Sequence, residues 1–155
     1  MATVYEKSVS LSPIYLPNEQ AGRDWAAQLA PQLPRSGFIS LVGPLGAGKS
    51  HFARSTLQAL GHSGAVPSPT YTLVEHYASI PAFHLDLYRL GDPEELEFLN
   101  MREAIASNAL CLIEWAEKGA GWLPPAQLEL AFDYQDEGRV VRISGPALES
   151  LSLPS

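Results

Sequence analysis

The segment Gly43-Pro44-Leu45-Gly46-Ala47-Gly48-Lys49-Ser50 constrains the fold of this chain more than any other part of the sequence. It matches in full the pattern of a phosphate-binding loop, in which a glycine, four residues, a second glycine, a lysine and a serine or threonine follow one another. A short apolar run, 38–42, precedes the segment, and a helix-forming stretch, 49–60, follows it. Because this loop occurs between a buried strand and a helix, the sequence predicts an α/β fold.

Each residue type in the loop has a task in binding a nucleotide. The glycines allow the backbone to curl so that successive amide N–H groups point at phosphate oxygens, and the N-terminus of the following helix adds partial positive charge. We expect the Lys49 ammonium to reach the β- and γ-phosphates, and the Ser50 hydroxyl to ligate the Mg²⁺ that bridges them. An ordinary glycine-rich turn is the alternative, and the complete match favours the phosphate-binding loop.

A metal ion held by one hydroxyl also needs a carboxylate at the same edge of the sheet. Two residues qualify, because Glu114 ends the apolar run 110–113 and Asp86 ends a run of alternating character. The wholly apolar run indicates the more central strand, so we favour Glu114 as the metal ligand. Asp86 is then expected to position water or the metal's outer ligands. Either carboxylate could instead cap a strand end or pair with an arginine, and Arg89 lies near Asp86 in the sequence.

Composition and charge narrow the class of protein. The chain has 155 residues, of which 46% are hydrophobic, so we expect one domain over 1–155 with a loosely held tail over 146–155. The formal net charge of -7 argues against a broad binding face for nucleic acid or anionic lipid. No apolar run is long enough to cross a membrane, and no secretory signal is visible. The single cysteine, Cys111, lies in an apolar run and is expected to be buried, and one cysteine allows no internal disulfide. Together these observations favour a protein of the reducing cytoplasm.

Strands and helices alternate along the chain with short connections. Asn18 is expected to cap a helix whose apolar face carries Trp25, Ala26, Leu29 and Leu33. The other expected elements are one or two strands over 4–16, an exposed loop over 61–70, strands over 72–77, 82–88 and 110–115, a helix that begins at Asp92, and an antiparallel hairpin of 128–134 and 139–144. This order predicts a P-loop NTPase-like sandwich with a mostly parallel sheet and added antiparallel strands.

Several longer sequence blocks accompany the loop. Unlike the loop, they do not correspond to a general structural or catalytic motif. They are SPTYTLVEHY, FHLDLYRL followed by DPEELEF, CLIEW and DYQDEGR, and with GPLGAGKS they extend over about 16–144. The occurrence of these blocks together in this order is too specific to be a chance similarity between unrelated proteins. On these residues the sequence resembles the TsaE (YjeE) family of bacterial P-loop ATPases, which takes part in making threonylcarbamoyladenosine in tRNA.

The resemblance implies roles for individual residues. Ser50 and Glu114 would hold Mg²⁺, Thr70 would lie on a switch-like loop that senses the γ-phosphate, and Asp86 would assist hydrolysis. Glu19 and the Gly138-Arg139 turn would flank the adenine and ribose. The residues expected to bind the nucleotide are therefore Glu19, Gly43, Leu45, Gly46, Ala47, Gly48, Lys49, Ser50, His51, Gly138 and Arg139, and those expected to act in catalysis are Lys49, Thr70, Asp86 and Glu114.

Three positions depart from the family's usual residues. Pro44 stands where the family often has aspartate, Ser50 where threonine is common, and His51 where a second threonine or serine often follows. Serine keeps the hydroxyl for the metal. Pro44 lacks an amide N–H, which removes one donor if the loop uses the amide at this position. His51, at the start of a helix, could face solvent or contact a partner, and this reading is favoured over a catalytic role.

The resemblance also implies how the chain acts. It would not transfer threonylcarbamoyl itself but would support the transferase pair TsaD and TsaB, with ATP as a switch. Direct recognition of tRNA stays open, but the acidic charge disfavours an extended phosphate-binding face unless partners supply basic charge, so we expect tRNA to be reached only through that complex. No arginine finger is obvious, so we expect slow hydrolysis alone and stimulation by partners. Two other functions remain open: a small-molecule kinase, which normally needs an acceptor pocket and an arginine-bearing lid, and a module in which bound nucleotide is structural.

Overall fold

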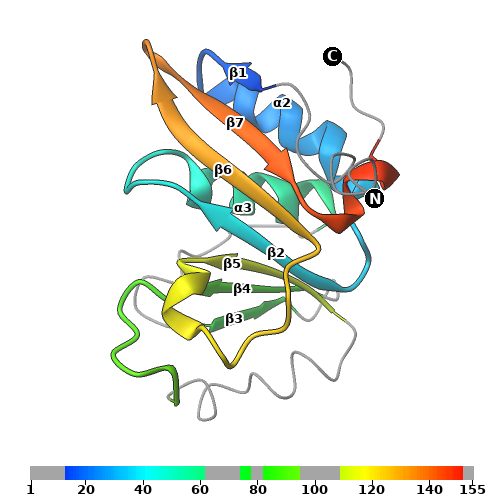
Figure 1. Cartoon of the computed structure of the whole chain (residues 1–155). Helices are drawn as coiled ribbons and strands as arrows, with labels where there is room; N and C mark the ends of the chain where they lie inside the picture. The colour runs from blue at the N-terminus through cyan, green and yellow to red at the C-terminus, as the bar shows by residue number, and fades with distance from the viewer. Residues whose placement is uncertain (1–12, 62–73, 78–81, 95–108, 152–155) are drawn as a thin grey trace, which may run out of the picture.

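In the part of the chain that the structure describes, the strands form one seven-stranded sheet in the order β1-β7-β6-β2-β5-β4-β3. The computed structural model describes residues 13–61, 74–77, 82–94 and 109–151 (Figure 1). Its elements are β1 (Ile14–Leu16), α2 (Glu19–Leu29), η1 (Ala30–Gln32), β2 (Gly37–Val42), α3 (Lys49–Ala59), β3 (Val74–Tyr77), β4 (Ala82–Asp86), β5 (Leu110–Glu114), η3 (Ala116–Gly119), β6 (Leu128–Gln135), β7 (Gly138–Ser144) and η4 (Pro146–Ser150).

The pairing directions confirm the predicted fold class. Strands β6, β2, β5 and β4 are mutually parallel and form the centre of the sheet. The remaining pairs, β1 with β7, β7 with β6 and β3 with β4, are antiparallel. The carboxyl ends of β2, β4 and β5 therefore meet at one edge of the sheet, which is where ligands bind in open α/β folds.

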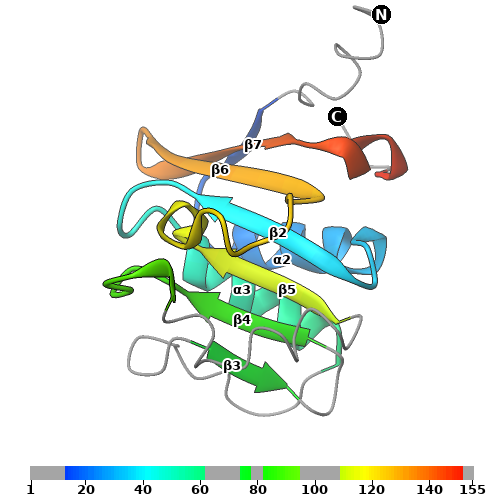
Figure 2. The same ribbon diagram turned by 60° about the horizontal axis from the view of Figure 1, so that its bottom comes forward.

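Apolar side chains on the two faces of the sheet form two cores. Helices α2 and α3 lie together on one face (Figure 2). On β5, Leu110 and Leu112 belong to the core under these helices, whereas Cys111 and Ile113 belong to the core on the opposite face. This alternation follows from the two-residue period of a strand. It directs Glu114, two residues after Leu112, to the same side of the sheet as α3.

The start of α2 confirms the predicted cap. The Asn18 side chain accepts a hydrogen bond from the Ala21 N–H at 2.9 Å, which satisfies one of the free donors of the first turn. Trp25, Ala26 and Leu29 are buried against the sheet side of the helix, as their spacing predicted. The helix ends before Leu33, which is buried but lies beyond η1.

Two strands end earlier than expected, and both new ends carry a carboxylate. The expected strand over 82–88 ends at Asp86, because its side chain accepts a hydrogen bond from the Tyr88 N–H at 3.1 Å and the chain turns there. The expected strand over 110–115 ends at Glu114, since Trp115 has a φ of 60° in the left-handed region. Asp86 and Glu114 are partners in the parallel register.

The predicted hairpin is confirmed, and the predicted tail is partly wrong. β6 and β7 pair from Gln135 opposite Gly138 outward, around a turn in which Asp136 has a φ of 53°. Over 146–150 the chain forms the 3-10 helix η4 instead of a loosely held tail, because Leu148 is buried in the core beneath α2 and α3. The last residues, 152–155, lie outside the described part of the chain.

Several other expectations concern residues outside the described ranges. These are the strand residues before 13, the loop over 62–70 with Thr70, and the body of the helix expected after Asp92. The start of that helix is described in part, because the Asp92 side chain accepts a hydrogen bond from the Glu94 N–H at 2.9 Å. Among the described residues, no helix is long and apolar enough to cross a membrane.

The single cysteine is expected to be unreactive in the folded chain. Cys111 is 1% exposed, and burial raises the pKa of its thiol to about 12. At about pH 8 only roughly 10⁻⁴ of such a thiol is the nucleophilic thiolate. Labelling with a maleimide should therefore be negligible in native buffer and should reach one label per chain in guanidinium chloride. Rapid labelling of the folded chain, followed by mass spectrometry, would contradict the buried placement.

Candidate active site

The phosphate-binding loop connects the end of β2 to the start of α3. Gly43, Gly46 and Gly48 all have positive φ values, of 142°, 79° and 110°. At Gly43 a Cβ atom would come within 2.3 Å of the carbonyl oxygen of Phe132 on β6, so a side chain does not fit there. The loop backbone is thus held close to the neighbouring strand, and α3 begins immediately after Gly48.

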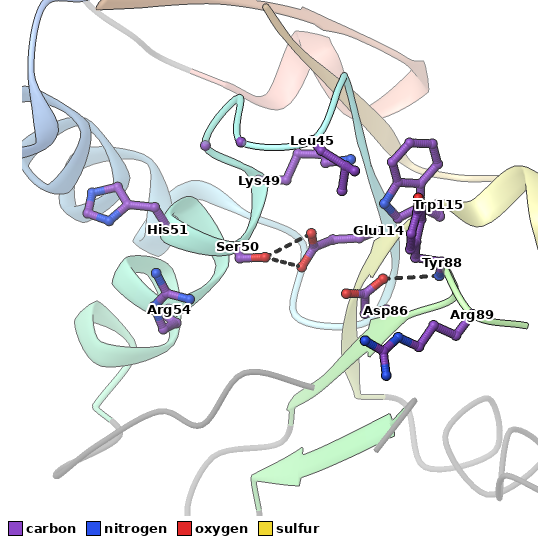
Figure 3. A pocket seen from close by; sticks show the side chains of 12 residues that line it. Leu45, Lys49, Ser50, His51, Arg54, Asp86, Tyr88, Arg89, Glu114 and Trp115 are labelled. Atoms are coloured by element: carbon purple, nitrogen blue, oxygen red, sulfur yellow. Dashed lines mark hydrogen bonds between the residues drawn. The ribbon is translucent and has the colours of Figure 1, made fainter. Parts of the chain in front are cut away.

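Ser50 and Glu114 meet across the edge of the sheet. The Ser50 hydroxyl lies 3.0 Å from both carboxylate oxygens of Glu114 and donates to them (Figure 3). On the other side of the carboxylate, Nε2 of His84 lies 2.7 Å from Oε2. Glu114 is 3% exposed and His84 is completely buried. The carboxylate is thereby held from two sides, and its position at the end of β5 follows from the strand alternation described above.

Lys49 lies at the base of the loop with little exposure to solvent. Its Nζ donates a hydrogen bond to the Gly43 carbonyl at 2.6 Å and lies 3.8 Å from the centre of the Trp115 ring. Burial lowers the pKa of the Lys49 ammonium, and the nearby carboxylates of Glu114 and Asp86 act in the opposite direction. A partly desolvated ammonium attracts an incoming anion more strongly than a fully hydrated one, because the local dielectric constant is lower.

Asp86 lies beside Glu114 at the end of the adjacent strand (Figure 3). Burial raises the pKa of its carboxyl, the Tyr88 N–H lowers that pKa, and the Glu114 charge raises it. A carboxylate with a raised pKa is a better proton acceptor than an ordinary aspartate. Asp86 therefore has the position and the chemistry to orient a water molecule and to accept a proton from it.

These residues line one open cavity of about 420 Å³. The structure brings Lys49, Ser50, Asp86 and Glu114 together there, as the sequence predicted from the meeting of strand ends. Four further residues line the cavity that the sequence did not predict there: Arg54, Tyr88, Arg89 and Trp115. Arg54 lies one helical turn beyond Ser50 on α3, and this spacing is the sequence signal for its place here. Thr70 lies outside the described residues.

A second cavity, of about 240 Å³, adjoins the first at the loop. It brings together Glu19, His51, Gly138 and Arg139, which come from three distant parts of the sequence. His51 lies in both cavities, and its Nε2 is 3.2 Å from the Glu19 carbonyl oxygen. The residues expected to flank the base and ribose thus share one hollow next to the loop. Their contacts with a nucleotide remain a prediction.

The β6–β7 hairpin holds the outer part of the loop. The Tyr134 hydroxyl donates to the Leu45 carbonyl at 2.6 Å, and the Arg139 guanidinium donates to the Gly46 carbonyl at 3.2 Å. The guanidinium also lies 4.5 Å from the centre of the Tyr134 ring. Two neighbouring loop carbonyls are therefore turned toward the hairpin, which leaves the adjoining amides free to face a ligand.

Replacing Arg139 by glutamine is expected to weaken nucleotide binding about fivefold. The change removes a charge-assisted hydrogen bond to the loop, which at this half-exposed position stabilises it by about 1 kcal/mol. Arg142→Gln is the matched control, because Arg142 lies on the same strand and is exposed. Titration with a fluorescent ATP analogue compares the two variants. Equal affinities would show that Arg139 contributes nothing to the loop.

The oxygen atoms of Ser50 and Glu114 fit a magnesium ion. Mg²⁺ prefers oxygen ligands and is commonly held by one or two protein groups together with phosphate oxygens and water. Among the described residues there is no group of three or more histidine, cysteine or acidic side chains arranged as a complete protein cage. The donor set therefore suits an ion that arrives with a phosphate-bearing ligand.

Comparisons with known proteins agree with this fold and identify the family. The family model described as threonylcarbamoyl adenosine biosynthesis protein TsaE matches residues 16–141. The tRNA threonylcarbamoyladenosine biosynthesis protein TsaE of Haemophilus influenzae is 50% identical over 108 residues, which cover 68% of each chain. The protein of the same name from Rickettsia felis is 36% identical over 129 residues, covering 81% of this chain and 75% of the relative. The crystal structure of YdiB from Bacillus subtilis superposes with a TM-score of 0.73 at 24% identity, covering 88% and 85% of the two chains.

Proposed function

Because this chain belongs to the family of threonylcarbamoyl adenosine biosynthesis protein TsaE, we propose that it binds and hydrolyses Mg·ATP in support of the threonylcarbamoyladenosine modification of tRNA. One observation carries the proposal. Lys49, Ser50, Asp86 and Glu114 converge on one cavity at the mouth of a complete phosphate-binding loop, with Ser50 3.0 Å from both Glu114 oxygens. This is the set of groups that phosphoryl transfer to water requires.

Each residue has one task in the proposed reaction. The loop amides and the Lys49 ammonium bind the phosphates and stabilise the charge that develops on them. Ser50 and Glu114 hold Mg²⁺, which when bound neutralises part of the phosphate charge. Asp86 orients the attacking water in line with the bond that breaks and accepts its proton, a role that its raised pKa favours.

The family and the charge of the chain support a proposal about its partners. The chain would support the transferase pair TsaB and TsaD in the cytoplasm, with the nucleotide state acting as a switch between turnovers. With a net charge of -7 it would reach tRNA only through that complex. Two arginines of this chain, Arg54 and Arg89, already line the cavity. Partners would therefore stimulate hydrolysis by ordering these side chains and not by supplying an arginine that the cavity lacks.

The proposal is tested by measuring phosphate release from Mg·ATP by the chain alone and with TsaB and TsaD added. We expect slow release alone, faster release with the partners, and neither in Lys49→Ala. If the partners change nothing, the switch model is wrong. If phosphate is transferred to a small-molecule acceptor instead of being released, the chain is a kinase. If Glu114 variants support tRNA modification fully, the bound nucleotide is structural.

A further inference from the structure

The proposed metal ligand Glu114 rests on a completely buried histidine to which neither the sequence motifs nor the proposed reaction assigns a role. His84 lies in the middle of β4, between Phe83 and Leu85, whose side chains belong to the core on the far side of the sheet. The alternation of the strand directs His84 to the α3 side, together with Asp86. There its Nε2 lies 2.7 Å from Oε2 of Glu114.

The hydrogen bond to Glu114 is the polar contact that accounts for a histidine at this position. His84 is 0% exposed, and its second ring nitrogen, Nδ1, has no partner among the residues that the structure describes. If His84 only filled space, an apolar side chain could take its place. If it only joined a structural hydrogen-bond network, both of its ring nitrogens would be expected to have partners. Since an ionised carboxylate only accepts hydrogen bonds, a bond to Glu114 in that form requires a proton on Nε2.

From these contacts we propose that His84 is a positioning residue for the metal site, which fixes the Glu114 carboxylate so that an oxygen remains directed at Mg²⁺ and Ser50. The inference rests on the proposed function, since it concerns the ion that Glu114 would hold. Without the Nε2–H donor, Oε2 would be a buried charged atom short of one hydrogen bond, and the side chain would turn away from the cavity to recover it. Partners of this kind orient ligands in many metal sites.

Glutamine and asparagine separate this role from simple packing. The amide nitrogen of a glutamine extends about as far from the backbone as Nε2 of histidine, whereas that of an asparagine ends about where Nδ1 lies. His84→Gln therefore restores the donor to Glu114, and His84→Asn places a polar group of the same kind where it cannot reach. His84→Phe keeps the volume of the ring and removes the donor.

The experiment measures the dissociation constant of the non-hydrolysable analogue AMP-PNP by calorimetry, once with Mg²⁺ and once with EDTA. The ratio of the two constants is the enhancement that the metal gives to nucleotide binding, and it needs no turnover. We expect His84→Phe and His84→Asn to lower this ratio by about 10- to 100-fold, as for other partners of metal ligands, with unchanged affinity in EDTA. His84→Gln should stay within about threefold of the wild type.

Each other outcome is decisive. Equal ratios for the glutamine and asparagine variants, or a wild-type ratio in all variants, would overturn the positioning role. An equal loss of affinity with and without Mg²⁺ would show that His84 supports only the general structure. If His84→Phe does not fold, the comparison of glutamine with asparagine decides the matter alone. A wild-type chain whose binding of AMP-PNP does not depend on Mg²⁺ would refute the proposed function itself.

Discussion

Replacement of Lys49 by alanine is expected to lower ATP hydrolysis about 10²- to 10³-fold, the range found when one donor to the charge of a transition state is removed. Lys49 is the one cation that the structure places inside the loop, with Nζ 2.6 Å from the Gly43 carbonyl. The loop amides remain in the variant, so nucleotide affinity should fall much less than the rate. Single-turnover measurements of phosphate release separate these two effects.

A second lysine, outside the loop, provides the matched control. Lys118 is exposed and its Nζ lies 5.3 Å from the Tyr88 ring, outside the loop. Lys118→Ala should hydrolyse ATP at the wild-type rate. Because burial lowers the pKa of Lys49, folding disfavours its charged form relative to its neutral form. If Lys49→Ala hydrolyses ATP at the wild-type rate, the loop does not take part in the reaction as proposed.

Replacement of Glu114 by glutamine is expected to abolish the dependence of hydrolysis on Mg²⁺ and to lower its rate by about 10²-fold or more. Glutamine keeps the volume of the side chain and an acceptor for Ser50 and His84, but it lacks the negative charge that holds the ion. Binding of ATP in EDTA should be kept or strengthened, because one negative charge near the phosphates is gone. Mg²⁺ titrations of rate and of affinity test both statements.

Glu129→Gln is the control for the loss of one negative charge. Glu129 is exposed near the start of β6 and pairs with Ser144, away from the loop. It should leave the Mg²⁺ dependence unchanged. If Glu114→Gln keeps a normal response to Mg²⁺, the ion is held elsewhere, and the inference about His84 loses its basis at the same time.

The sequence predicted the parts of the site that depend on the direction of the chain. A complete loop motif between a strand and a helix indicated where phosphates bind. The apolar run before Glu114 and the alternating run before Asp86 indicated carboxylates at the same edge. Both predictions needed only the rule that the carboxyl ends of parallel strands lie at the same edge of a sheet. The structure does bring Ser50 and Glu114 into contact, although the roles of these residues remain predictions.

What the sequence did not predict depends on the register between strands. His84 and Asp86 share a face of β4 by alternation, but only the pairing of Asp86 with Glu114 shows that His84 reaches the same carboxylate. The contact of Lys49 with Trp115 likewise requires the left-handed backbone at Trp115, for which no residue pattern gives a sign. The segment over 146–150 was expected to belong to a loosely held tail, yet it forms η4 and Leu148 is buried in the core.

The anchoring of the loop by β6 and the hairpin has a consequence for the thermodynamics of binding. The loop is held at its start by the close approach of Gly43 to Phe132 and at its outer part by Tyr134 and Arg139. Its conformational entropy is therefore lost when the chain folds, before any ligand arrives. Association then carries a smaller entropic penalty, so the free energy of the phosphate contacts is retained as affinity.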